Sequence, residues 1–524
     1  MLLEINMTKV LLFNQYFTSE KDSPEKILAS LPINLLYLAS YLKSKRIDCK
    51  IYELGIFDYD KAIVENNRVK FGISDAEIST IIRNERPKII GIGCVYTRHY
   101  IDVVAISKTI KKIDPSIKVV LGGNHATTFC EMVLKEQNID FVVKGEGEIT
   151  LYELCNAILS SNEDYKKIDG LVYRDENKSI IKTRDRELIK NLDKLPPIAY
   201  SILDIRKYAE ASRQSPFLMR YPAVGVVSSR GCPGKCVYCT VKAVYGRTWR
   251  GRSPDNVVNE IEFLHKEYGI KEFSFLDDSA SLNQKRWNEI CDEIIDRELD
   301  IRWTTPNGIA HWTLDKPTLR KMKTAGCYRV TFGIESGNVK TRKFLGKPYS
   351  LLQAKEMIQY ANKIGMWTIC TNILGFPYET KEAMEDTIEF AKKSGTDFAT
   401  FYLLAPHVVS DVYSYFKKEG LLDFDFIFSE DVLDEGKYEE MNRILHDGGV
   451  STKYHSSEEL KKIQIKAYRS FIIYRAITYL NPLRLLKKIR SIEDFKYTIR
   501  LIFTGFQILM KSFYKKTTEA LLYE

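Results

Sequence analysis

Three cysteines stand within eight residues of this 524-residue chain, and the loop that carries them is the strongest constraint in the sequence. Cys232 and Cys236 are separated by three residues, and Cys236 and Cys239 by two. A loop of this length can place three thiolates around one corner of a cubane, and a [4Fe–4S] cluster takes cysteine thiolates as ligands. Three protein ligands leave one iron open to a group that is not protein.

Two alternatives to an iron–sulfur cluster fit these spacings less well. A closed zinc site needs four ligands, usually as two spaced pairs, and no second cysteine or histidine pair follows the loop at that spacing. Chance clustering is weaker still, because the other seven cysteines are scattered singly: Cys49, Cys94, Cys130, Cys155, Cys291, Cys327 and Cys370. The loop therefore predicts a cluster with an open iron.

The length indicates two or three domains with sizeable cores. Hydrophobic residues make up 44% of the chain and charged residues 28%, which are ordinary values for a globular protein. The cysteines lack the spacing of a disulfide framework, and a thiolate-bound cluster needs a reducing compartment, so we expect a cytoplasmic protein. The first residues show no signal-peptide pattern, and no uncharged apolar run reaches the roughly 18 residues of a membrane-spanning helix.

Most of the net charge of +9 lies near the C-terminus. Residues 471–516 hold ten Lys or Arg against Glu493 and Asp494, whereas the rest of the chain is close to neutral. This distribution argues against a nucleic-acid partner. Apolar residues recur beside these cations at three- and four-residue steps. The pattern predicts either a basic amphipathic segment on the inner face of a membrane or a helical cap folded onto the preceding domain.

Residues 1–150 alternate short buried strands with amphipathic helices, which predicts an α/β domain with a Rossmann-like, doubly wound parallel sheet. Ligands bind such a sheet outside the carboxyl ends of its strands. Three of those ends carry glycine pairs, at positions 91 and 93, 122 and 123, and 145 and 147. Glycine lets the backbone approach a ligand closely. No G-x-G-x-x-G opens the first helix, so the dinucleotide fingerprint is absent.

Residues 151–221 carry a helix, a hairpin-like pair at 168–182 and two adjacent prolines, and we interpret them as an interdomain linker. Residues 222–410 alternate strands and helices through six βα units, which predicts a partial TIM barrel. Polar residues follow consecutive strands, which favours an active site at the carboxyl ends of the barrel strands. Any one of these residues could instead cap a helix or form a surface ion pair. Residues 411–524 are expected to be mostly helical.

The order of the cysteine gaps, with Tyr238 before the last cysteine, resembles the radical SAM superfamily. In that family the open iron is chelated by S-adenosylmethionine (SAM), and reductive cleavage of SAM releases a 5′-deoxyadenosyl radical. The resemblance implies SAM contacts from Tyr238, Asp277, Asp278, Asn307, Glu335, Ser336, Gly375 and Glu379. The Gly-Gly-Glu common in the superfamily after the second strand is replaced here by Leu276-Asp277-Asp278.

The strand-end motifs Leu-Gly-Gly-Asn-His-Ala-Thr and Gly-Glu-Gly-Glu of the first domain resemble those of the cobalamin-binding radical SAM subfamily. The resemblance implies that cobalamin rests near a set of strand-end residues: Thr97, Gly122, Gly123, His125, Gly145 and Glu146. The Asp-x-His-x-x-Gly motif of cobalamin mutases is absent. We therefore expect His125 to pack a loop or cap a helix, and not to ligate cobalt.

Together these resemblances imply a cobalamin-dependent enzyme that methylates an unactivated carbon through a 5′-deoxyadenosyl radical and methylcobalamin. The implied partners are a small-molecule substrate, either lipid-like or a natural-product intermediate, and an electron donor such as flavodoxin or ferredoxin. An oxidative cyclisation or rearrangement, as in the anaerobic magnesium-protoporphyrin monomethyl ester cyclase branch, is the alternative. A non-catalytic iron–sulfur carrier or sensor, or a zinc-binding interaction protein, is more distant because neither needs a row of polar strand ends.

Overall fold

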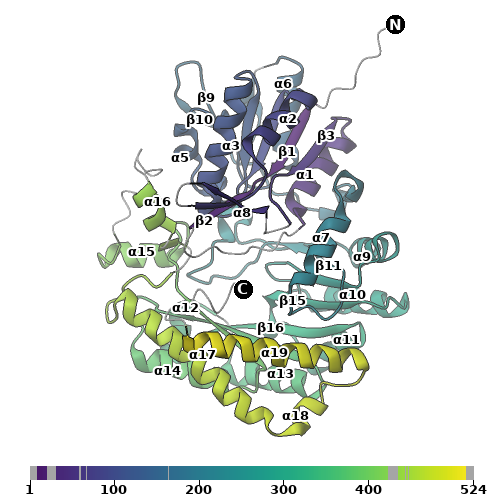
Figure 1. Cartoon of the computed structure of the whole chain (residues 1–524), viewed down its shortest axis with the longest axis vertical. Helices are drawn as coiled ribbons and strands as arrows, with labels where there is room; N and C mark the ends of the chain where they lie inside the picture. Colours follow the sequence, from purple (N-terminus) through teal and green to yellow (C-terminus); the bar gives the residue numbers. More distant parts are fainter. Residues whose placement is uncertain are drawn as a thin grey trace. The chain divides into compact units, whose positions relative to one another are not determined.

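The computed structural model describes the chain except for residues 1–8, 21–30, 58–60, 66–67, 163, 348, 423–434, 443, 446–447 and 515–524. The chain forms two compact units, and Figure 1 follows it through both. The first unit spans Met1–Tyr208 with Ala243–Tyr245 and Asp425–Asn442, and the second unit takes the remaining residues. Among the described helices, none is long and apolar enough to cross a lipid bilayer.

The first unit is built on a seven-stranded sheet with the order β10-β9-β8-β7-β6-β1-β3. Its parallel strands are β1 (Val10–Asn14), β3 (Cys49–Glu53), β6 (Ile89–Gly93), β7 (Lys118–Gly122) and β8 (Phe141–Val143). These strands are mostly buried because helices pack in pairs beside them, as expected for a parallel sheet. The helix pairs are α1 (Ile33–Ser44) with α6 (Gly147–Leu159) and α2 (Asp75–Glu85) with α3 (Tyr100–Ile113). The predicted doubly wound sheet is confirmed.

The segment after α6 continues the first sheet. β9 (Leu171–Arg174) pairs antiparallel with β8, and β10 (Ile180–Lys182) pairs antiparallel with β9. Most of β9 is buried, because it covers the edge that β8 would otherwise leave open. The predicted hairpin is therefore present as part of the sheet, and the first unit extends through Tyr208, beyond the expected boundary at residue 150.

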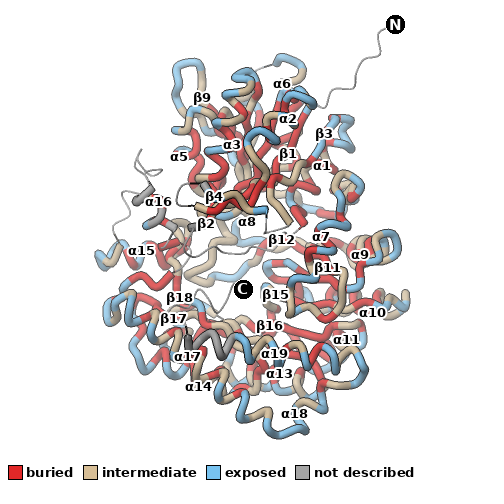
Figure 2. Tube along the Cα trace, in the orientation of Figure 1, coloured by how far each residue is buried: buried red, intermediate tan, exposed pale blue. Residues whose placement is uncertain are grey.

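The second unit contains the expected six-stranded parallel sheet, in the order β11-β14-β15-β16-β17-β18. Its strands are β11 (Ala223–Val226), β14 (Glu272–Phe275), β15 (Arg302–Ile309), β16 (Cys327–Glu335), β17 (Trp367–Leu374) and β18 (Phe398–Leu403). The main helices between them are α9 (Pro254–Tyr268), α10 (Gln284–Asp296), α11 (Lys316–Thr324), α13 (Leu351–Lys363) and α14 (Lys381–Lys393). In Figure 2 the strands of both sheets are mostly red, the colour of buried residues. The predicted partial barrel is confirmed.

Side-chain caps fix where the barrel helices begin. Ser253, Asn283, Asp315, Ser350 and Thr380 each accept a hydrogen bond from a backbone N–H in the first turn of the helix that follows. A cap of this kind stabilises a helix by about 1 kcal/mol. Because each helix starts at a defined residue, the loop between it and the preceding strand end has a defined length and path.

The C-terminal helices pack on the second unit partly through their cationic side chains. Lys488, which follows α18 (Pro482–Leu486), is 3% exposed, and its Nζ lies 2.8 Å from Asp397 Oδ2. On α19 (Ile492–Tyr514), Arg500 Nε donates to the carbonyl of Pro216 at 3.1 Å. The buried Tyr497 hydroxyl donates to the carbonyl of Phe217 at 2.9 Å and accepts from Arg329 Nη1 at 3.1 Å. This segment is therefore a helical cap on the second unit, and its contact with a membrane stays a prediction.

Removing the Tyr497 hydroxyl should destabilise the second unit. In Tyr497→Phe, the buried Arg329 guanidinium loses an acceptor and the Phe217 carbonyl loses a donor, so we expect the free energy of unfolding to fall by about 1–3 kcal/mol. Urea unfolding followed by tryptophan fluorescence measures this fall. Tyr415→Phe, which changes a 38% exposed side chain, is the control. Equal stability of the two variants would contradict the anchoring role of Tyr497.

Candidate active site

The cysteine loop follows the short strand β12 (Ser229–Arg230). Its three thiols, those of Cys232, Cys236 and Cys239, are partly exposed, whereas the other seven cysteines are all buried. The Gly234 N–H donates to Cys232 Sγ at 3.4 Å. A Cβ at position 234 would lie 3.3 Å from Cys232 Sγ and 3.8 Å from Cys236 Sγ, so glycine leaves both thiols free. Partly exposed thiols are the ligand type of an iron–sulfur cluster, but among the described residues no three such side chains are gathered as a metal site, so the cluster ligands stay a prediction.

Two acidic residues at the end of β14 hold the start of this loop. The carboxylate of Asp277 is buried and accepts from the Ser228 N–H at 3.1 Å and the Ser228 hydroxyl at 2.7 Å. It also accepts from the Ser229 hydroxyl at 2.5 Å. Asp278 is exposed and accepts from the Gly231 N–H at 3.0 Å. The SAM contacts expected of both residues stay predictions, and the structure adds a role in shaping the loop.

A buried ion pair at the end of β16 was missed in the sequence. Lys347 Nζ lies 2.9 Å from Glu335 Oε1 and donates to the Gly333 carbonyl at 3.0 Å. The same ammonium lies 5.9 Å from the centroid of the Tyr238 ring, in the cysteine loop. Although burial alone lowers the pKa of Lys347, the Glu335 carboxylate raises it well above its usual value. The Lys347 side chain is therefore an ammonium cation. No local motif marks Lys347, which comes twelve residues after its partner.

The backbone around this pair is constrained. Glu335 has φ +64°, a left-handed conformation that costs a residue other than glycine about 1–3 kcal/mol. A Cβ at Gly333 would lie 2.8 Å from Glu335 Oε1 and 3.3 Å from Lys347 Nζ, so the pair occupies the space beside this glycine. Gly346 has φ +71°, and a Cβ there would lie 3.1 Å from the Lys235 carbonyl. Glycine at 346 thus lets the segment carrying Lys347 approach the cysteine loop.

The remaining residues expected at the SAM site take different positions. The ring of Tyr238 lies 6.5 Å from that of Phe376, between centroids, so the cysteine loop meets the turn after β17. Asn307 is exposed and donates from Nδ2 to the Leu276 carbonyl at 2.9 Å. Ser336 is buried, and its Oγ lies 3.2 Å from Thr387 Oγ1 of α14. The structure thus brings Tyr238 together with the ion pair, whereas the Ser336 hydroxyl contacts a neighbouring helix.

Glu379 shapes the turn after β17. Its carboxylate is buried and accepts from the Gly375 N–H at 2.8 Å and the Phe376 N–H at 3.3 Å. Burial raises the pKa of Glu379 to about 7. Gly375 has φ +88°, which this turn requires and which glycine adopts without strain. Gly375 and Glu379 therefore form one unit, and their expected contact with adenosine stays a prediction.

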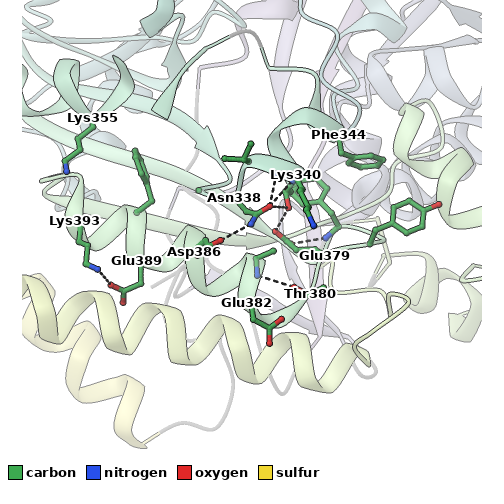
Figure 3. A pocket seen from close by; sticks show the side chains of 17 residues that line it. Asn338, Lys340, Phe344, Lys355, Glu379, Thr380, Glu382, Asp386, Glu389 and Lys393 are labelled. Atoms are coloured by element: carbon green, nitrogen blue, oxygen red, sulfur yellow. Dashed lines mark hydrogen bonds and ion pairs between the residues drawn. The ribbon is translucent and has the colours of Figure 1, made fainter. Parts of the chain in front are cut away.

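A cavity of about 950 Å³ lies on the neighbouring surface, between α12 (Val339–Leu345) and α14. Figure 3 shows polar side chains around it, including Asn338, whose Nδ2 donates to Asp386 Oδ2 at 2.8 Å. Phe376 and Glu379 reach it, but neither the cysteines nor Tyr238 or Glu335 line it. This cavity adjoins the candidate SAM site and shares Phe376 and Glu379 with it.

In the first unit, strand-end glycines form the rim expected to hold cobalamin. Gly123 has φ +106°, and a Cβ there would lie 2.5 Å from the Cys94 carbonyl oxygen, so only glycine fits this turn. At Gly122 the nearest atom to an added Cβ is the Val143 carbonyl oxygen, at 3.9 Å. The Gly145 N–H donates to Thr127 Oγ1 at 3.0 Å. A close-fitting backbone with little side-chain cover is compatible with a large planar ligand at this edge.

His125 lies beneath this rim. Its Nδ1 is 3.2 Å from Thr97 Oγ1, and its ring packs 4.4 Å from the Tyr100 ring and 5.0 Å from the Phe129 ring, between centroids. Burial lowers the pKa of His125 to about 3, so the imidazole is neutral. Glu146 is also buried and accepts from the Ile189 N–H at 2.9 Å. The structure thus places His125 in loop packing, and its expected contact with cobalamin stays a prediction.

Tyr438 is a further rim residue that the sequence did not reveal. It lies on α16 (Glu435–Asn442), a late segment that belongs to the first unit. Its buried hydroxyl lies 3.0 Å from the Thr97 carbonyl and 2.6 Å from the Arg98 carbonyl, and it accepts from the Ile101 N–H at 3.2 Å. This hydroxyl fixes the loop after β6, where Thr97 is expected to meet cobalamin. More than 330 residues separate Tyr438 from that loop, so local pattern gives no sign of the contact.

Two family models match the chain. Residues 226–391 match the radical SAM superfamily, and residues 30–155 match the B12 binding domain. An uncharacterized methyltransferase of Pyrococcus horikoshii is 34% identical over 87% of this chain and 90% of its own length. The anaerobic magnesium-protoporphyrin IX monomethyl ester cyclase of Rubrivivax gelatinosus is 27% identical over 78% of this chain and 71% of its own.

The fold is also similar to that of a solved structure. The radical S-adenosylmethionine methyltransferase TsrM of Kitasatospora setae, with cobalamin and a [4Fe–4S] cluster bound, superposes with a TM-score of 0.63 at 18% identity. The match covers 79% of this chain and 75% of the other. The similarity therefore extends over most of both proteins.

Replacing Glu379 should change how stability depends on pH. Because the folded-state pKa of about 7 lies above the usual 4.5, the folded state holds this proton more tightly than the unfolded chain. The stabilisation is complete below pH 4.5 and is lost as the pH rises through about 7, at a cost of about 3 kcal/mol. In Glu379→Gln we expect this loss to disappear in urea unfolding between these pH values. The exposed Glu385→Gln is the control, and an unchanged slope in Glu379→Gln would contradict the prediction.

Proposed function

The chain belongs to the cobalamin-binding branch of the radical SAM superfamily, and on that premise we propose that it methylates an unactivated carbon of a small molecule. The observation that carries this proposal is the methyltransferase relative, whose 34% identity extends over 87% of the chain and so includes both domains. The accessible cysteine triplet and the glycine rim in the first unit support it. We propose a natural-product intermediate or a lipid-like molecule as the substrate class.

The residues of the second unit would hold the cluster and SAM. When bound, these groups supply an electron and a cleavable sulfonium, and cobalamin in the first unit carries the methyl group. Cys232, Cys236 and Cys239 bind iron, and the Glu335–Lys347 pair offers one carboxylate and one ammonium to the charged and hydroxyl groups of SAM. The Tyr238 and Phe376 rings supply an apolar wall near this pair. Burial of the pair keeps water away from its charges.

An electron donor is a required partner for this chemistry. Lys235, in the cysteine loop, and Arg247, whose Nη1 donates to the Gly234 carbonyl at 2.7 Å, are both exposed. Two exposed cations at the cysteine loop favour a donor with an acidic docking surface, because opposite charge speeds encounter. Flavodoxin or ferredoxin is the type of donor that we propose. Contact of the C-terminal helices with a membrane stays a prediction.

An oxidative cyclisation is the second candidate. It is favoured by the similarity to the ring cyclase of Rubrivivax gelatinosus, which covers 78% of this chain. Both reactions start from the same radical, so the site in the second unit alone does not separate them. The two candidates differ in the products made from SAM. Methylation forms S-adenosylhomocysteine as well as 5′-deoxyadenosine, whereas cyclisation forms 5′-deoxyadenosine alone.

The reaction can be tested without knowing the substrate. Full-length protein is reconstituted anaerobically with iron, sulfide and hydroxocobalamin, reduced, and incubated with a small-molecule extract and SAM bearing a trideuterated methyl group. We expect about four irons and one cobalt per chain, and S-adenosylhomocysteine with 5′-deoxyadenosine. Mass spectrometry should find a product that carries the label. 5′-Deoxyadenosine without S-adenosylhomocysteine or label transfer would favour cyclisation, and iron without cobalt would overturn both candidates.

Replacing Lys347 tests the proposed SAM site. Lys347→Met leaves Glu335 without its counter-charge, and we expect SAM affinity to fall about tenfold or more, the effect of losing roughly 1.4 kcal/mol. Equilibrium dialysis with the reconstituted protein measures the affinity. Lys347→Arg should recover part of it, and Lys343→Met, at an exposed position on α12, should leave it unchanged. If the folded Lys347→Met variant binds SAM as tightly as the wild type, Lys347 is not part of the site.

A further inference from the structure

A second cavity, of about 350 Å³, lies in the second unit where α13 and α14 end. Its walls also include residues of α17 (Ser457–Tyr479) and the segment around α18. The last residues of α13 and α14 precede β17 and β18, so the cavity lies at the amino ends of these strands. The cysteine loop and the ion pair stand at the carboxyl ends. The cavity is therefore separate from the candidate active site.

The cavity is strongly cationic. Six Lys or Arg side chains line it but only one carboxylate, that of Asp397; the cations are Lys363, Lys392, Lys393, Arg484, Lys487 and Lys488. Three of these six cations pair with carboxylates. Lys488 pairs with Asp397, whereas Lys392 and Lys393 share Glu389, which stands outside the cavity. Two carboxylates, Asp397 and Glu389, therefore serve three of the cations, and the cavity has more cations than acids.

Asp397 is already held by several donors other than the remaining cations. Its Oδ2 accepts from the Thr368 N–H at 2.7 Å as well as from Lys488. Its Oδ1 accepts from the Tyr479 hydroxyl at 2.6 Å. Within the part of the chain that the structure describes, three of the lining cations have no carboxylate partner: Lys363, Arg484 and Lys487. The cavity thus keeps several positive charges uncompensated.

A buried cation behind the cavity adds to this field. Arg475 is 5% exposed, and its Nε has no hydrogen-bond partner. Its guanidinium lies 5.7 Å from the ring centroid of Tyr474, which lines the cavity. Burial lowers the pKa of Arg475, and burial also lowers that of Lys488. Cations held close together in low dielectric repel one another unless an anion joins them.

We propose that this cavity binds a phosphate-bearing anion. Phosphate carries more than one negative charge and several acceptor oxygens, so it can engage the guanidinium of Arg484 and the ammonium groups of Lys363 and Lys487 together. A volume of about 350 Å³ accommodates a small phosphate ester. Such a site would explain C-terminal cations that do not pack inward as Lys488 and Arg500 do, namely Arg484 and Lys487.

The phosphate has two sources that share this chemistry, a soluble phosphate compound and a lipid headgroup. Exposed apolar side chains stand beside the cationic residues in sequence: Leu480 is 80% exposed, Leu483 62% and Leu486 60%. Apolar residues flanking lysine and arginine are the arrangement with which helices contact anionic lipid surfaces. The experiment below therefore has one arm for each source.

The test uses full-length protein and a triple variant, Lys363→Gln, Arg484→Gln and Lys487→Gln. The matched control, Lys271→Gln, Lys453→Gln and Lys462→Gln, removes the same charge from exposed lysines that do not line the cavity. Calorimetric titration with inorganic pyrophosphate probes a soluble source. Flotation with phosphatidylcholine vesicles, with and without phosphatidylglycerol, probes a headgroup. We expect the triple variant to lose affinity for at least one probe by about tenfold while the control keeps it.

Each result decides the proposal. Loss confined to pyrophosphate identifies a soluble phosphate compound, and loss confined to phosphatidylglycerol vesicles identifies a headgroup. Binding that falls equally in the triple variant and the control reflects general charge and overturns the site. Absence of wild-type binding to both probes overturns it as well. Thermal unfolding of all three proteins in the absence of probe checks that the variants are folded.

Discussion

One buried carboxylate determines where the metal-binding loop begins. Asp277 ends β14, and its oxygens hold two adjacent serines that follow the neighbouring strand β11. The Ser228 carbonyl is held in turn by Arg286 Nη2 of α10, at 2.6 Å. β11 and β14 pair in parallel, so their carboxyl ends lie together. Asp277 can therefore fix the direction in which the chain leaves both strands. The positions of the three thiols follow from that direction.

The features that the sequence predicted are those that local pattern determines. Buried strands of three to nine residues alternate with amphipathic helices, and each parallel sheet follows from that alternation. The cysteines are close in sequence, so they share one loop whatever the fold. The edge hairpin was visible as a hairpin, but its attachment to β8 depends on which sheet edge is open. That is a property of the assembled sheet.

The residues that were missed act through contacts distant in sequence or through side-chain direction. Lys347 reaches Glu335 only because an intervening helix turns back, and Tyr438 reaches Thr97 from α16. Ser336 follows directly after Glu335, yet its hydroxyl contacts Thr387 while Glu335 contacts Lys347. In the C-terminal segment, periodicity identified a two-faced helix but not which face turns inward. Lysine and arginine have long apolar stems, so a buried cation such as Lys488 is compatible with the same pattern.

The missing side chain at Gly333 has a consequence for how this protein can change. The Glu335–Lys347 pair fills the space that a methyl group at 333 would need, so position 333 is tied to two others. An alanine at 333 would displace the Glu335 carboxylate while the pair is present, and it meets neither side-chain end once the pair is lost. The reverse path, from alanine back to the pair, requires the glycine first. Position 333 and the ion pair therefore depend on each other, so a substitution at one changes what the other can hold.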